Sequence, residues 1–208
     1  MNTKLILSPV NSLFFVPSEV VVDNVFTDVE VNLITNYCSK NLNLDKGELF
    51  ESNQDYSTRE AITGFIEYPT TDTQWLYDKL HKVIEFHNDQ FFQFELTGLP
   101  YIQYAEYHVG GHHDFHMDTA LGNRSRLDYR INENLRKLTV VVMLTQVNVD
   151  FTGGEFFINC STERAANFIN LQKGSVLIFP SFLLHKVAPV ISGVRKTLTT
   201  WVIGPKFK

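Results

Sequence analysis

The sequence predicts an α+β fold in which helices precede an antiparallel β-sandwich or barrel. In the first half, apolar residues recur at roughly helical spacing from Thr71 to Phe92, and a second helix is expected from Val29 to Cys38. After Pro100 the pattern changes to short runs rich in β-branched and aromatic residues, with glycines in the turns between them. Many short strands after a helical start are typical of this fold class.

The first turn of the later helix contains a capping signal. Thr71 and Gln74 have the spacing of a capping box, in which each side chain satisfies a backbone N–H group of the other residue. The strands expected after it are Tyr101–Val109, Leu138–Leu144, Glu155–Ile158, Ser175–Phe179, Leu183–Val190 and Thr197–Ile203. Glycines indicate the turns between them, at Gly110-Gly111, Gly153-Gly154 and Gly174.

One domain is expected for the whole chain, residues 1–208. Its 208 residues, 44% of them apolar, can bury one substantial core. No repeat, low-complexity tract or Pro/Gly/Ser-rich linker divides them. We therefore expect a helix-rich supporting part, residues 1–99, and a β-strand core, residues 100–208.

Charge and cysteine content narrow the class of protein. The net charge of -5 comes from 23 acidic and 18 basic residues without long runs, which disfavours a nucleic-acid partner. Cys38 and Cys160 are too few for a disulfide framework or a four-cysteine zinc site, so we expect reduced thiols, although one bridge stays open. No apolar run has the length of a signal peptide or of a membrane span. A cytoplasmic location without membrane attachment is the expectation.

A polar and charged stretch from Thr119 to Leu135 interrupts the strand pattern. It is too long for an ordinary hairpin turn, and connections of this length often serve as functional lids. Its arginines, Arg124, Arg126 and Arg130, either contact a substrate or lie in a solvated loop. The expectation is a lid over a site.

The segment from Tyr107 to Asp118 contains four of the seven histidines of the chain and two aspartates. Such clustering indicates a metal site. On a strand, alternate side chains share a face, so His116 and Asp118 can supply two ligands to one ion. His112 and Asp114 have the same spacing two strand steps earlier, and this pair stays open as the alternative. The spacing of His112 and His116 also fits a helical zinc pair, which the preceding glycines and the missing glutamate disfavour.

His185 is the expected third ligand. Two histidines and one carboxylate form a facial triad that leaves three positions of Fe(II) open for a chelating cosubstrate and dioxygen. Arg195 follows the Ser192-Gly193 turn, so an antiparallel return can bring its guanidinium near the metal, where its planar fork suits a carboxylate. Thr197 should share that face and offer its hydroxyl group to the same carboxylate.

Three motifs resemble those of the prolyl 4-hydroxylase-like Fe(II)- and 2-oxoglutarate-dependent oxygenases. Tyr107 to Asp118 looks like the first iron motif of that family, and His185 to Arg195, followed by Trp201, is similar to the second. Gly153-Gly154-Glu155 resembles the turn that the family has between them. The resemblance covers roughly Tyr101 to Gly204 and implies a double-stranded β-helix, a jelly-roll or cupin-like core, with N-terminal supporting helices.

The resemblance also implies residue roles. His116, Asp118 and His185 would bind Fe(II), and Arg195 would pair with the distal carboxylate of 2-oxoglutarate. Further cosubstrate-binding residues would be Tyr107, Thr197 and Thr199, and substrate-binding residues Arg136 and Trp201. Met143 departs from the pattern, because several members have a tyrosine contacting the cosubstrate there. Dioxygen would be the second cosubstrate, and ascorbate is a candidate additional cofactor.

The function implied is a dioxygenase that hydroxylates a C–H bond, first of all in a prolyl residue of a peptide or protein. Three alternatives stay open: the same chemistry on a free amino acid or small molecule, a cupin-like hydrolase or other non-haem oxygenase with the same triad but no 2-oxoglutarate, and a non-catalytic binding or sensing module. Neither nucleic acid nor a membrane is an expected partner, and the sequence makes no prediction of oligomeric state.

Overall fold

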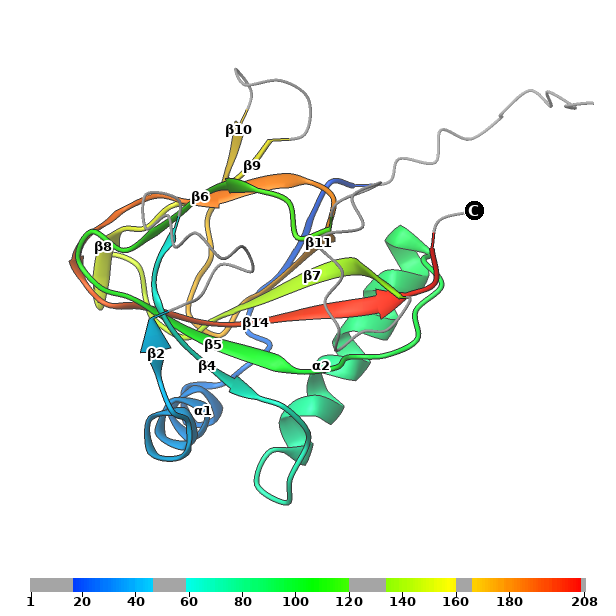
Figure 1. Ribbon diagram of the computed structural model, residues 1–208, viewed down its shortest axis with the longest axis horizontal. Helices are drawn as coiled ribbons and strands as arrows, with labels where there is room; N and C mark the ends of the chain where they lie inside the picture. The colour runs from blue at the N-terminus through cyan, green and yellow to red at the C-terminus, as the bar shows by residue number, and fades with distance from the viewer. Residues whose placement is uncertain (1–16, 47–58, 120–133, 160–165, 207–208) are drawn as a thin grey trace, which may run out of the picture.

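The computed structural model describes residues 17–46, 59–119, 134–159 and 166–206. Their strands form two sheets that face each other, and the helices cover the outer side of the larger sheet (Figure 1). All of the strand pairings in these sheets are antiparallel. The predicted α+β class with an antiparallel core is therefore confirmed.

The larger sheet lies between the helices and the smaller sheet. Its seven strands are hydrogen-bonded in the order β1-β11-β7-β14-β5-β4-β2. Their bounds are Val20–Val22 for β1, Val176–Pro180 for β11, Leu135–Met143 for β7, Arg195–Gly204 for β14, Ile102–Tyr107 for β5, Ile62–Ile66 for β4 and Asp45–Lys46 for β2. The long strands β7 and β14 lie at its centre, where they are paired on both sides.

The smaller sheet lies opposite and has five strands in the order β10-β9-β12-β6-β3. Their bounds are Ala166–Ile169 for β10, Phe156–Asn159 for β9, Leu184–Val187 for β12, His112–His116 for β6 and Arg59–Glu60 for β3. At one end a hairpin of β8 and β13 closes the structure, with bounds Phe151–Gly153 and Val190–Gly193.

The larger sheet is covered on both faces by apolar side chains. Leu198 and Val202 of β14 belong to the core on the helix side, whereas Val141 and Met143 of β7 pack into a second core shared with the smaller sheet. Because side chains alternate along a strand, Arg195 and the residues two and four positions after it face the second core. The space between the sheets therefore receives polar residues of β14.

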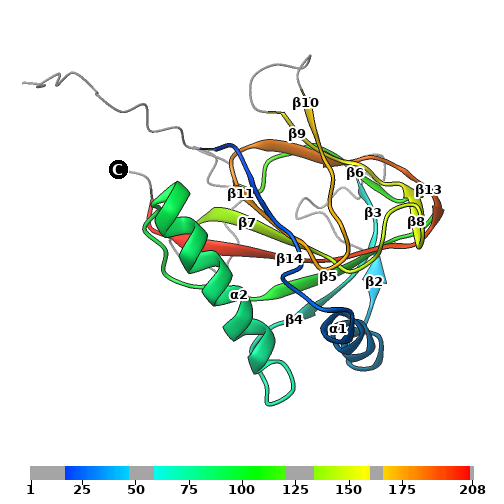
Figure 2. The same cartoon turned by 180° about the vertical axis from the view of Figure 1, so that it is seen from behind.

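Two helices form the outer layer, which Figure 2 shows from behind. Helix α1 spans Asp28–Asn41, so the predicted helix from Val29 to Cys38 is confirmed and is longer at both ends. Helix α2 spans Gln74–His87 and continues as the π-helix η1, Asn88–Phe92. The predicted capping box is wrong: Thr73, not Thr71, is the N-cap, and its hydroxyl group contacts Thr70 instead of capping the helix.

The six predicted strand runs are all present, with one division. The run from Leu183 to Val190 is split into β12 and β13 at Ala188-Pro189, where proline cannot donate to a ladder. The short strands β1 to β4, β8 and β10 were missed, and β3 and β4 pair with β6 and β5. The first half thus contributes strands as well as helices. The predicted boundary between a supporting part, residues 1–99, and a core, residues 100–208, stays a prediction.

Several predictions concern residues outside the described ranges. The arginines of the predicted lid lie at 120–133, and Cys160 also lies outside the description. Cys38 is buried and free, as expected, and burial raises the pKa of its thiol to about 12. Within the described part of the chain, no helix combines the length and apolar content that a membrane crossing requires.

Replacing Thr27 by alanine should lower the free energy of unfolding by about 1 kcal/mol, the usual value for an N-cap. Thr27 Oγ1 accepts from Glu30 N at 3.3 Å, and Glu30 Oε2 accepts from Thr27 N at 2.8 Å. Urea unfolding measures the change. Thr35→Ala is the control, because the Thr35 hydroxyl only contacts Val31 O inside α1, where alanine is the better helix former. Equal losses in both variants would contradict the capping role.

Candidate metal centre

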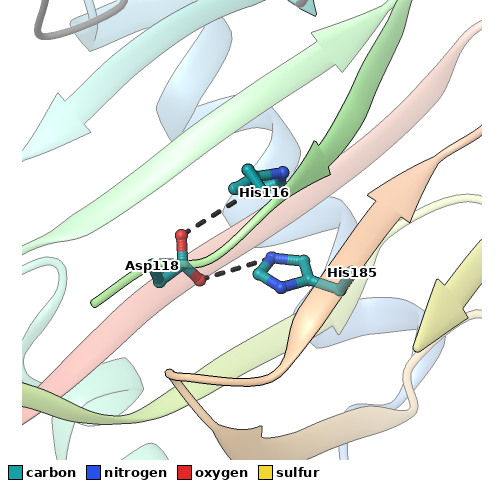
Figure 3. Close-up of side chains that lie close together, drawn as sticks. All are labelled: His116, Asp118 and His185. Carbon is teal, nitrogen blue, oxygen red and sulfur yellow. Dashed lines mark ion pairs between the residues drawn. The ribbon is translucent and has the colours of Figure 1, made fainter. Parts of the chain in front are cut away.

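Three side chains converge between the sheets, close to where β6 ends. His116 is the last residue of β6, Asp118 follows two positions later, and His185 lies on β12 directly opposite His116. Asp118 Oδ1 lies 3.7 Å from His116 Nε2, and Asp118 Oδ2 lies 3.4 Å from His185 Nε2 (Figure 3). The three potential ligand atoms lie within 4.8 Å of one another, which suits a single ion.

The local backbone explains why these side chains meet. The register of β6 against β12 shifts between His116 and His113, which indicates a bulge, and the His113 ring stacks on His116 with 3.5 Å between centroids. After His116 the strand ends, and the backbone N–H groups of Asp118 and Thr119 both donate to Ser181 O. Strand alternation predicted the shared face correctly, but these two contacts, not a continuing ladder, turn Asp118 inward.

The alternative pair, His112 and Asp114, is not part of this group. Asp114 is exposed, and its Oδ1 accepts from Phe115 N at 2.8 Å. Among the described residues, the grouping of His116, Asp118 and His185 is the one with metal-ligand spacing. Because residues 112–116 form a strand, a helical zinc pair is also excluded.

Hydrogen bonds to the histidine rings orient them for metal binding. His116 Nδ1 lies 2.8 Å from Asp114 O, and His185 Nδ1 lies 2.9 Å from Leu183 O. Only a protonated nitrogen can donate to a carbonyl oxygen, so these contacts place a proton on Nδ1 of each ring and make Nε2 the nitrogen that can bind an ion.

The pKa values of the group favour the protonation states that a metal needs. Burial, and next to it His185, lower the pKa of His116 to about 4, so its imidazole is neutral at pH 7. Burial by itself would raise the pKa of the Asp118 carboxyl, but His185, His116 and Arg136 together hold it well below its ordinary value. A neutral imidazole next to a carboxylate is a ligand set that needs no prior deprotonation.

Among the described residues, no carboxylate pairs with the buried charge of Arg195. Arg195 is 1% exposed, and its Nε and one terminal nitrogen have no hydrogen-bond partner among the described residues. Its guanidinium lies 5.3 Å from the ring centroid of Tyr107, its cross-strand partner. Burial lowers the pKa of Arg195, yet a guanidinium stays protonated. The arrangement fits a bound carboxylate, which would supply the missing acceptors.

Comparison with known proteins agrees with this reading. The profile of the 2OG-Fe(II) oxygenase superfamily matches residues 102–203, which include all three members of the triad and Arg195. The chain belongs to the 2OG-Fe(II) oxygenase superfamily. It is also similar to a PKHD-type hydroxylase of Colwellia psychrerythraea, with 34% identity over 50% of this chain and 42% of the relative. The chain spans about two fifths of the length of this and two other PKHD-type hydroxylases to which it is similar.

Solved structures show the same fold. A viral collagen prolyl hydroxylase from Paramecium bursaria Chlorella virus-1 superimposes with a TM-score of 0.67 at 17% identity, covering 90% of this chain and 97% of the other. A prolyl hydroxylase from Trichoplax adhaerens, in complex with a hypoxia-inducible-factor peptide, gives 0.68 at 20% identity, covering 89% and 83%. The predicted double-stranded β-helix is confirmed.

For a 2OG-Fe(II) oxygenase, the remaining predicted cosubstrate residues lie where the sequence placed them. Thr197 is buried and pairs with Met143 across β7, and Thr199 is half-buried opposite Gln103. Both share the inner face of β14 with Arg195. Met143 is also buried on the inner face of the larger sheet, where it belongs to the second core.

The Gly153-Gly154 turn packs against the aliphatic part of Arg195. Gly154 has φ +64, and a Cβ atom there would lie 3.0 Å from Arg195 Cδ. A residue with a side chain would therefore meet both backbone strain and crowding. This contact gives a physical reason for the second glycine of the turn that the family resemblance singled out.

The two predicted substrate residues lie against each other beside the triad. The Arg136 guanidinium lies 4.0 Å from the ring centroid of Trp201, and it donates to Tyr101 Oη at 2.7 Å. Trp201 Nε1 is buried without a hydrogen-bond partner among the described residues. Since the Arg136 charge also lowers the pKa of Asp118, the pair lies within electrostatic reach of the metal centre.

Sequence reasoning missed several polar neighbours of the triad. Thr139 donates to Asp118 Oδ2, and Ser181 lies behind Thr139. Arg59 of β3 donates to Gln103 Oε1 at 3.0 Å and acts on the pKa values of His113 and His116. A threonine or serine on a predicted strand carries no signal of its own, and Arg59 lies on a strand too short to predict.

Proposed function

We propose that the protein is an Fe(II)- and 2-oxoglutarate-dependent dioxygenase that hydroxylates a prolyl residue in a peptide or protein. The observation that carries the proposal is the buried Arg195, which has no charged partner among the described residues and faces the same space between the two sheets as the His185 ring. An uncompensated buried charge costs several kcal/mol, so the site is built to receive an anion. A dicarboxylate that reaches from the metal to Arg195 meets that requirement.

The donor set supports iron as the metal. His116, Asp118 and His185 would hold Fe(II) on one side and leave room for a chelating cosubstrate and dioxygen, as facial triads do. When bound, iron supplies the activation of dioxygen that hydroxylation requires. The protein would supply the orientation: Tyr107, the cross-strand partner of Arg195, and Thr197 would contact the cosubstrate, and apolar side chains of the second core would exclude water.

Arg195 is also the residue that separates this proposal from its rivals. A cupin-like hydrolase or an oxygenase without 2-oxoglutarate needs the triad but not a buried cation deep in the sandwich. A binding module without catalysis would not require two histidine rings that are held by carbonyl oxygens next to a carboxylate.

Two observations support a peptidyl-proline substrate. Trp201 Nε1 has no hydrogen-bond acceptor among the described residues, and the Arg136 guanidinium packs on the Trp201 ring, which offers a flat aromatic surface. An amide carbonyl and a pyrrolidine ring would suit such a donor and wall. The similar proteins point the same way, since one is named as a collagen prolyl hydroxylase and another was solved with a peptide. A reducing compartment such as the cytoplasm suits both ferrous iron and the free Cys38 thiol.

The test measures succinate formed from 2-oxoglutarate under air with Fe(II) and ascorbate, with and without a panel of proline-containing peptides. We expect at least one peptide to stimulate succinate formation and to gain one oxygen atom per succinate. Matched peptides with alanine in place of proline, and free proline, are the controls. Succinate formation that never exceeds the iron-only blank would contradict the proposal, and stimulation by free proline alone would redirect it to an amino-acid hydroxylase.

A further inference from the structure

Two buried hydroxyl groups form a line behind the Asp118 carboxylate. Thr139 Oγ1 donates to Asp118 Oδ2 at 2.7 Å and lies 2.9 Å from Ser181 Oγ. Thr139 is 1% exposed and Ser181 is 0% exposed, so protein groups must satisfy both hydroxyls. The carboxylate is therefore contacted from the protein interior as well as by the two histidines.

The direction of this line follows from counting protons. A threonine hydroxyl has one hydrogen, and Thr139 gives it to the carboxylate. The oxygen of Thr139 can then only accept from Ser181, so the Ser181 hydroxyl must donate. A hydroxyl that both donates and accepts in this way has its rotation fixed, which makes Thr139 a better oriented donor than an isolated threonine.

Ser181 also holds the backbone around Asp118. Its carbonyl oxygen accepts from Asp118 N at 2.9 Å and from Thr119 N at 3.1 Å, and its own N–H donates to Lys137 O at 3.0 Å. Ser181 lies in the turn between β11 and β12, and β12 carries His185. One residue thus connects the carboxylate ligand to the strand of the third ligand.

We propose that Thr139, backed by Ser181, is a positioning residue that makes Asp118 a one-oxygen ligand of the metal. A carboxylate oxygen that accepts a short hydrogen bond has less charge to share with an ion, so the other oxygen becomes the ligand. A two-oxygen carboxylate would use one of the positions that a facial triad leaves open. This inference rests on the proposed function, because it concerns the same metal.

The sequence offers a matched control for this role. Thr200 is also 1% exposed, lies on the neighbouring strand β14, and donates to Tyr101 O at 2.6 Å. It alternates with Arg195 and Thr199 and so belongs to the opposite face of the sheet. Thr200→Val and Thr139→Val therefore remove chemically equal buried hydroxyls, of which only one touches the metal centre.

The experiment titrates the metal-free proteins with Co(II) alone, without oxygen or 2-oxoglutarate, and records the dissociation constant and the visible absorption, whose intensity reports coordination number. We expect Thr139→Val to bind Co(II) about 10–100-fold more weakly, the usual effect of losing an outer-shell partner, with altered absorption. Thr139→Ser should retain most of the affinity and the wild-type spectrum. Thr200→Val should equal the wild type in both, although it loses stability in thermal unfolding.

The outcomes separate this inference from the proposed function. If the wild type binds Co(II) and Thr139→Val binds it with the same affinity and spectrum, the inference alone is overturned. The same holds if all three variants lose Co(II) affinity in proportion to their loss of melting temperature. A wild-type protein that does not bind Co(II) would overturn both. If Thr139→Val does not fold, Ser181→Ala removes the outer hydroxyl and should give the same altered spectrum with a smaller loss of affinity; an unchanged spectrum there would count against the inference.

Discussion

Replacing His185 by alanine should remove both metal binding and succinate formation. His185 is 4% exposed, lies opposite His116 in the smaller sheet, and points Nε2 at the Asp118 carboxylate. Without it, two ligands remain, and the loss of metal affinity should exceed the roughly 10–100-fold effect of an outer-shell change. Iron content after anaerobic loading and succinate formation under air measure the two effects.

The controls for His185 must separate ligation from packing. Its ring packs against Phe156 and Phe179, so alanine also leaves a cavity. His185→Gln keeps most of the volume and should lose iron as completely, with a smaller loss of stability. His81→Ala removes an exposed imidazole of α2 and should change neither iron content nor succinate formation. If both His185→Gln and His185→Ala still bind iron, His185 is not a metal ligand.

The convergence of His116, Asp118 and His185 was predictable because its signals are local. His116 and Asp118 follow from two-residue alternation on a strand, and His185 with Arg195 follows from a turn and an antiparallel return. The prediction could not foresee how Asp118 is held. It lies beyond the end of β6, and its orientation depends on the backbone of Ser181, far away in the sequence. Tertiary contacts of this kind have no periodicity to detect.

The same limit explains the errors in the first half. Strands β2 and β3 have two residues each, too few for an alternating pattern, and they exist because β4 and β6 offer free edges. The capping box at Thr71 was matched by spacing alone, and a hydrogen bond from Thr70 N to Thr73 Oγ1 moved the start of α2. Thr139 was predicted only as part of a strand, because the sequence does not distinguish a threonine that hydrogen-bonds a neighbouring carboxylate from one that only packs.

Replacing Arg195 by methionine should weaken 2-oxoglutarate binding by roughly 30-fold to several thousand-fold. Removing one partner of a buried, hydrogen-bonded charge pair costs about 2–5 kcal/mol, and each 1.4 kcal/mol is a factor of ten. The dissociation constant of 2-oxoglutarate can be measured by calorimetry without oxygen, with Mn(II) in place of iron. Metal affinity itself should not change, because Arg195 is not among the ligand atoms.

The stability of the variant gives a second, independent reading of Arg195. Without cosubstrate, the wild-type protein buries a guanidinium whose Nε and one terminal nitrogen have no acceptor in the described part of the chain, so methionine should leave the melting temperature equal or higher. Adding 2-oxoglutarate should raise the melting temperature of the wild type and not of the variant. A residue that served packing or an internal ion pair would show the opposite sign, a loss of stability on replacement.

Two further variants decide what the guanidinium contributes. Lys196→Met removes the next cation on β14, which pairs with Glu106 at 3.0 Å, and should leave 2-oxoglutarate binding intact. Arg195→Lys keeps the charge without the planar fork and should bind with intermediate affinity. If Arg195→Met binds 2-oxoglutarate as tightly as the wild type, the carboxylate is not held there. The triad would then belong to an oxygenase that uses another cosubstrate, because the metal ligands alone do not select 2-oxoglutarate.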